Sequence, residues 1–167
     1  MREPESPAGR IDHDLEREIV NYPLPWNVLL LPRNLHFLLT GTASAVRICV
    51  DLAFRRVEAL FPPPRPGRRR VSVERAAIAL SLTERLLRSR LFPFRRTCLR
   101  RSLLLAHLLR RSGIEVEIAL GVDPGGGKFR GHSWLCRGGR PFLETDEEWR
   151  RHTAMFYLPI NDRSPGG

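Results

Sequence analysis

The spacing of apolar residues changes at Gly113, and this change constrains the fold of the 167-residue chain more than any other feature. Before it, residues 97–112 (TCLRRSLLLAHLLRRS) carry apolar side chains three and four positions apart, which predicts a buried helix. Thr97 suits the N-cap of this helix, and Gly113 suits the residue that ends it. After Gly113, residues 114–120 alternate between apolar and polar or small side chains, which predicts a strand.

Three more short strands are predicted after the first one. They cover His132–Arg137, Arg140–Thr145 and Met155–Ile160, and Gly138–Gly139 forms a hairpin turn between the first two. Strands joined by such short turns are antiparallel. The sequence therefore predicts an α+β fold in which helices are followed by a small antiparallel sheet.

Upstream of this region the chain divides at a segment rich in proline and arginine, residues 62–70. Such a segment forms a stiff, exposed connector, so we predict that it separates residues 1–61 from a domain at 71–167. Within 1–61, the 3–4 residue spacing over Leu35–Phe61 predicts a helix. Met1–Asn21 is polar and acidic, and we expect a loose arm without core residues. A further helix is predicted over Ser72–Arg90, with Ser72 as its N-cap.

The chain is strongly basic, with 28 Lys+Arg against 18 Asp+Glu and a net charge of +10. Lys128 is the only lysine. Arginine binds carboxylates and phosphates bidentately, so an acidic peptide and a nucleic acid are both candidate partners. An arginine bias of this kind also arises from codon usage in a GC-rich genome.

No apolar run reaches the roughly 18 residues that a membrane-spanning helix needs. The first residues are acidic, unlike the basic start and apolar middle of a secretory signal. We therefore expect a cytoplasmic protein.

Three cysteines, Cys49, Cys98 and Cys136, are an odd number and lack CxxC spacing, which disfavours both a disulfide framework and a zinc site. The segment GGGKF at 125–129 lacks the remaining residues of a phosphate-binding loop. We therefore expect no metal and no cofactor.

Cys98 is the best candidate for a reactive residue. It falls on the first turn of the predicted helix 97–112, where unpaired N–H groups, the helix dipole and neighbouring arginines favour a thiolate. A thiolate is the form that acts as a nucleophile. The alternative is that Cys98 is a small buried core residue, which is common for a free cysteine.

His132 and an acidic residue complete a possible triad. His132 opens a predicted strand after a glycine-rich stretch, so it could face the start of the helix and act as a base. Glu144 lies on the next strand, one step out of register with His132, and Asp146 is its rival. Either carboxylate could orient the imidazole. The alternatives are a structural histidine and a solvated acidic turn over Glu144–Glu148.

The stretches CLRRSLLLAHLLRRSGIEVEIALGV and GHSWLCRGGRPFLE carry a family resemblance. Between Cys98 and Glu144 the chain resembles the catalytic domain of bacterial lasso-peptide leader peptidases, of the microcin-processing, transglutaminase-like type. The separations of 34 positions from Cys98 to His132 and 12 from His132 to Glu144 suit this family. Glutamate stands where the family usually has aspartate, and His-Ser-Trp replaces the commoner His-Ala-Trp.

The resemblance implies a transglutaminase-like or papain-like thiol-hydrolase core at 71–167. It implies a cysteine protease that removes the leader from a ribosomally made lasso precursor, with Cys98 as nucleophile, His132 as base and Glu144 as the orienting acid. Residues 1–61 do not resemble the winged-helix recognition domain of some relatives. The implied partners are therefore the leader region of the precursor, a separate leader-recognition protein and a lasso macrocyclase.

Two other functions remain open. A basic, non-catalytic adaptor that binds nucleic acid or an acidic protein would explain the charge but not the order of Cys98, His132 and Glu144, so nucleic-acid binding is not expected. Another thiol activity on the same scaffold, such as acyl transfer to an amine, would use the same three residues.

Overall fold

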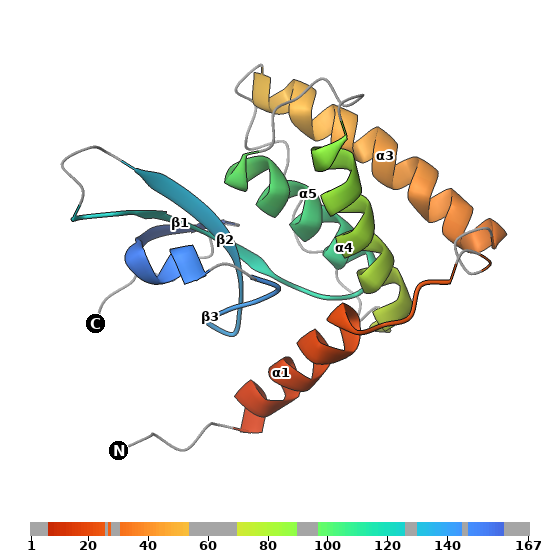
Figure 1. Cartoon of the computed structure of the whole chain (residues 1–167), viewed down its shortest axis with the longest axis horizontal. Helices are drawn as coiled ribbons and strands as arrows, with labels where there is room; N and C mark the ends of the chain where they lie inside the picture. Colours follow the sequence, from red (N-terminus) through yellow and green to blue (C-terminus); the bar gives the residue numbers. More distant parts are fainter. Residues whose placement is uncertain are drawn as a thin grey trace.

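The computed structural model describes residues 7–25, 27, 31–53, 70–89, 97–125, 130–144 and 147–158. In this part of the chain, four α-helices precede a four-stranded antiparallel sheet (Figure 1). The fold class predicted from the change in apolar spacing is therefore confirmed. Residues 62–69 of the predicted linker lie outside the described residues. The helices are α1 (Pro7–Val20), α3 (Pro32–Ala53), α4 (Val73–Arg88) and α5 (Cys98–Arg111).

The ends of α4 and α5 follow from local sequence. The Ser72 hydroxyl accepts a hydrogen bond from the Arg75 N–H, and the Thr97 hydroxyl accepts one from the Arg100 N–H, both at 3.3 Å. Each predicted N-cap is thus confirmed. At the other end of α5, Gly113 adopts a φ of 84°, which only glycine takes readily. The N–H of Ile114 then reaches the Leu109 carbonyl at 3.0 Å, which closes the helix.

The sheet has the strand order β3-β2-β1-β4. Its strands are β1 (Glu117–Val122), β2 (Gly131–Arg137), β3 (Arg140–Pro141) and β4 (Thr153–Leu158), with a short 3₁₀ helix, η2 (Glu147–Arg151), before β4. The predicted strand Arg140–Thr145 is wrong in length, because the sheet pairing stops at Pro141. Leu143 has a φ of 55°, so its backbone leaves the extended conformation at this point.

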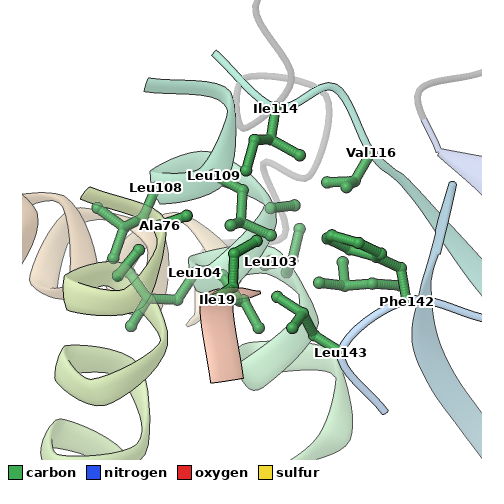
Figure 2. Packing of buried hydrophobic residues seen from close by; sticks show 14 of the residues in the cluster. Ile19, Ala76, Leu103, Leu104, Leu108, Leu109, Ile114, Val116, Phe142 and Leu143 are labelled. Atoms are coloured by element: carbon green, nitrogen blue, oxygen red, sulfur yellow. The ribbon is translucent and has the colours of Figure 1, made fainter. Parts of the chain in front are cut away.

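The two faces of the sheet have different surroundings. One face packs on the helices, and side chains such as Leu103 of α5 and Val116 and Phe142 of the sheet region share a large hydrophobic core (Figure 2). Alternate residues along β2 point the other way. There, Trp134 and Cys136 form a small cluster with Ala119, next to Trp149 of η2 and Tyr157 of β4.

Helix α1 contributes to the large core. Ile19 is only 1% exposed and belongs to the same cluster as Leu104 and Leu143 (Figure 2). In addition, Glu16 Oε1 accepts a hydrogen bond of 2.7 Å from the Leu143 N–H. The expectation that Met1–Asn21 has no core residues is therefore wrong. The polar composition of the segment obscures a single apolar stripe, which α1 turns toward α4.

Helix α3 also packs on α4 and α5, and its Phe37 and Ile48 lie in the large core. Within the described ranges, no helix combines the length and apolar character needed to cross a membrane.

Candidate active site

Cys98 is the first residue of α5 and is half-buried. Thr97 before it is extended, with φ −130° and ψ 154°, so the helix begins directly at the cysteine. The first N–H groups of a helix have no acceptor within the helix, and together with the dipole they stabilise a negative charge close to the helix start. The position is therefore suited to holding an oxyanion next to the sulfur.

His132 is the second residue of β2 and is paired with Gly121 of β1. Its ring stacks on the Trp134 ring with 5.9 Å between the ring centroids. The ring of His152 is tilted against the His132 ring, with 5.1 Å between these two centroids. Gly121 makes room for this arrangement, since a Cβ at this position would lie 2.7 Å from both the Trp134 ring and the Thr153 carbonyl oxygen. The glycine thus allows Trp134 to lie across β1.

Cys98 and His132 line the same cavity, whose volume is about 470 Å³. The cavity lies where the first turn of α5 meets the ends of β1 and β2, and Ser133 is the only other polar side chain among its described lining residues. The rest of the lining is apolar. The structure therefore brings together two of the three residues that the sequence singled out.

Glu144 makes its described contacts elsewhere. Its Oε1 accepts hydrogen bonds from Arg101 Nη1 at 3.0 Å and from the Leu135 N–H at 3.2 Å, and its side chain is 7% exposed. Its predicted role toward His132 stays a prediction. The rival acid, Asp146, lies outside the described residues.

Arg101 is at the centre of a buried charged cluster, which we define as Glu84, Arg101 and Glu144. Its Nε donates to Glu84 Oε1 at 2.7 Å, and its Nη2 donates to the Leu143 carbonyl at 3.0 Å. Burial by itself lowers the pKa of Arg101, but the two carboxylates outweigh burial and raise the pKa above its ordinary value. The guanidinium is thus a permanent charge that ties α4 and α5 to the chain after β3.

Cys136 is a poor candidate for the nucleophile. It is buried in the small cluster beside Trp134, and burial, aided by nearby Glu117 and Glu144, raises the pKa of its thiol to about 12 despite an opposing contact with Trp134. It therefore stays a protonated thiol at neutral pH. The side chain of Cys49 lies outside the described residues.

Sequence reasoning did not identify His152 as part of this region, and it counted Arg101 only among the arginines near Cys98, without the two carboxylates that bind it. His152 follows η2 and is twenty positions from His132, so no local pattern connects the two rings. The sequence does contain a signal for the pairing of Arg101, because a charged residue in a heavily apolar helix needs a partner when it is buried. Within the described residues, no three His, Cys, Asp or Glu side chains gather in a way that could hold a metal ion.

Comparison with known families gives a match over most of the chain. Residues 37–157, which are well over half of the chain, match the transglutaminase-like superfamily. This range includes α4, α5, the first three strands and all but the last residue of β4, together with Cys98, His132 and Glu144. No curated protein and no solved structure shows a significant match to the chain. With a cysteine at a helix N-terminus and a histidine on the adjoining sheet, the chain belongs to the transglutaminase-like superfamily.

Proposed function

We propose that this protein is a cysteine peptidase that removes the leader from a ribosomally synthesised, lasso-type precursor peptide. One observation supports it most directly: Cys98 at the start of α5 and His132 on β2 line one cavity. Members of the superfamily are generally cysteine-dependent enzymes. The resemblance between Cys98 and Glu144 to leader peptidases supports the choice of substrate.

The proposed reaction proceeds through a thioester. His132 takes the proton of Cys98, whose sulfur attacks the scissile carbonyl carbon. The carbonyl oxygen becomes an oxyanion, which the Cys98 N–H at the helix N-terminus stabilises. His132 then gives its proton to the leaving amine, and the peptide bond breaks. Water, deprotonated by His132, attacks the thioester and releases a carboxylic acid and free Cys98.

In this proposal Glu144 orients His132 and stabilises its charged form. To do so it must share its carboxylate with Arg101, because Arg101 Nη1 already donates to its Oε1. The freed core peptide would pass to a separate macrocyclase. The leader would be presented by a separate recognition protein.

The test combines neighbouring genes with an assay of the purified protein. We expect a short precursor gene and an asparagine-synthetase-like cyclase gene beside this one, and their absence would argue against the lasso-type substrate. The encoded precursor, incubated with the protein and its recognition partner, should be cut at one bond, as measured by mass spectrometry. Cys98→Ala should abolish the cut.

Cys136→Ala is the matched control, because it removes a buried thiol outside the cavity. It should keep cleavage at equal folded concentration. Retained cleavage by Cys98→Ala would remove the thiol mechanism. A reaction in ¹⁸O-labelled water should place the label in the new carboxylate. Transfer of the acyl group to an added amine without label uptake would instead indicate acyl transfer.

A further inference from the structure

We propose that the cavity beside Cys98 and His132 is a specificity pocket for an apolar side chain of the substrate. The side chain belongs to the residue that supplies the scissile carbonyl. This inference rests on the proposed peptidase function. Because Cys98 itself lines the cavity, the carbonyl that it attacks lies at the cavity wall, and the nearest substrate side chain is that of the same residue.

The lining supplies the chemistry of the pocket. Apart from the reactive pair and Ser133, its side chains are aliphatic, thioether or aromatic and come from three elements: Leu99 of α5, Leu120 and Val122 of β1, and Met155 and Phe156 of β4. The volume of about 470 Å³ lies in the range of about 300–1,000 Å³ typical of small-ligand sites.

A β-bulge places two of these side chains at the cavity. Leu120 pairs with Phe156, whereas the next residue, Gly121, pairs with Ala154, so Met155 is an extra residue in β4. Bulges of this kind redirect side chains and are frequent beside active sites. Met155 and Phe156 both border the cavity although they are neighbours in a strand, where side chains normally alternate between faces.

Both bulge residues are more exposed than large apolar side chains usually are, with 47% of Met155 and 66% of Phe156 accessible to solvent. Apolar surface of this kind beside reactive groups gains from being covered by an apolar ligand. Among the described lining residues, none is an aspartate, glutamate, lysine or arginine. A charged substrate side chain would therefore lose its water without finding a partner, which selects against it.

The experiment uses irreversible peptidyl acyloxymethyl ketones that differ only in the residue next to the ketone. Cys98 displaces the carboxylate leaving group and forms a thioether, which intact mass detects. We expect the leucine and phenylalanine probes to label Cys98 roughly 30–100-fold faster than the aspartate probe, in line with what apolar pockets achieve. Iodoacetamide, which needs no pocket, gives the baseline reactivity of the thiol.

Two variants test the lining. Phe156→Ala should slow the leucine and phenylalanine probes roughly tenfold without changing iodoacetamide labelling. Phe156→Arg should raise the rate of the aspartate probe above that of the unmodified protein, because it supplies the missing partner. Leu39→Ala is the matched control, since Leu39 of α3 is 64% exposed and does not line the cavity. It should change none of the rates.

Equal rates for all peptidyl probes would overturn the specificity pocket and leave the peptidase intact. Failure of every peptidyl probe to label Cys98, with iodoacetamide still reacting, would instead count against the peptidase function itself. A preference that persists unchanged in both Phe156 variants would overturn the assignment of the pocket to this cavity.

Discussion

Helix α5 borders two regions of opposite character, and comparing them separates chemistry from support. At its first residue, Cys98 faces the apolar cavity together with His132. One turn later, Arg101 lies in the charged cluster, where Glu84 and Glu144 already accept its hydrogen bonds. A cluster of charges that satisfy each other has little capacity left for a substrate. The apolar cavity, in contrast, has two reactive side chains and room for a substrate.

The two regions are nevertheless coupled by their position on the helix. Residues three apart lie on one helical face, so the Arg101 that holds the chain after β3 also lies beside Cys98. Arg101 binds the Leu143 carbonyl and Glu144, which are the last described residues before Thr145 and Asp146. The charged cluster therefore fixes the start of the segment that carries both candidate acids.

The largest expected effect comes from replacing Glu144, and it shows whether this residue acts on His132 or only on Arg101. If it orients His132, Glu144→Gln should lower the rate of precursor cleavage about 10²–10⁴-fold, because the imidazole loses its charged partner. Glu144→Asp should keep more activity than Glu144→Gln, since the charge remains. Asp146→Asn should cost less than about tenfold. Cleavage is measured at equal folded concentration.

The reversed result would show that Glu144 acts only in the charged cluster and takes no part in catalysis. Severe loss in Asp146→Asn with a tolerated Glu144→Gln would identify Asp146 as the acid. Weak effects from both would reduce the triad to Cys98 and His132. Urea unfolding of Glu144→Gln is the accompanying measurement, because loss of an Arg101 partner lowers the free energy of unfolding in either case.

Thiol reactivity should distinguish Cys98, which lines the cavity, from Cys136, which is buried in the small cluster. With its pKa raised to about 12 from an ordinary 9.0, the Cys136 thiol ionises about 1,000-fold less than an ordinary cysteine at neutral pH. Peptide mapping after iodoacetamide treatment at pH 7.5 should therefore find the label on Cys98 and not on Cys136. Equal labelling of both in the folded protein would contradict the assignment of the nucleophile.

The raised pKa of the Cys136 thiol also makes the free energy of unfolding depend on pH. Below pH 9 the Cys136 thiol is protonated in both the folded and the unfolded chain. Between pH 9 and about 12 only the unfolded chain releases the proton, so the contribution of Cys136 to folding is lost as the pH rises. Cys136→Ala should remove this part of the pH dependence in urea unfolding.

Breaking the charged cluster should act on the stability of the fold and not directly on the chemical step. Arg101→Ala leaves two carboxylates without their buried cation, and we expect a loss of about 3–5 kcal/mol in the free energy of unfolding. Arg88→Ala is the control, because Arg88 contacts the same Glu84 at 3.6 Å while its side chain is 69% exposed. It should cost under about 1 kcal/mol. Equal losses would show that the cluster is not a buried anchor.

The smallest effect is expected at the N-terminal helix. Ile19→Ala removes a fully buried side chain from the core beneath both regions, and we expect a loss of about 2–3 kcal/mol in urea unfolding. Val20→Ala, at a position 54% exposed, should change stability by less than about 0.5 kcal/mol. Deletion of residues 1–21 should also destabilise the fold. An intact free energy of unfolding after that deletion would show that α1 is dispensable.

Local sequence signals determined helices α4 and α5 and the catalytic candidates, whereas α1 lies in a segment that the sequence predicts to be a loose arm. The caps Ser72 and Thr97 and the stop at Gly113 depend on hydrogen bonds within a few residues, and the structure has them where the sequence predicts them. The change to alternating residues after Gly113 likewise predicts the sheet. Cys98 and His132 could be chosen because a helix start and a strand start are both visible locally.

Tertiary structure alone decided what these local elements contact. The sequence counts residues along a hairpin, but the positive φ of Leu143 turns the chain out of register and leaves Glu144 on Arg101. It shows a polar segment before residue 21, but not that Ile19 is buried in the core that α4 and α5 share. Contacts such as His132 with His152 depend on the path of the whole sheet. Local hydrogen bonding is fixed by neighbours in the chain, whereas burial and charge pairing depend on residues that only folding brings together.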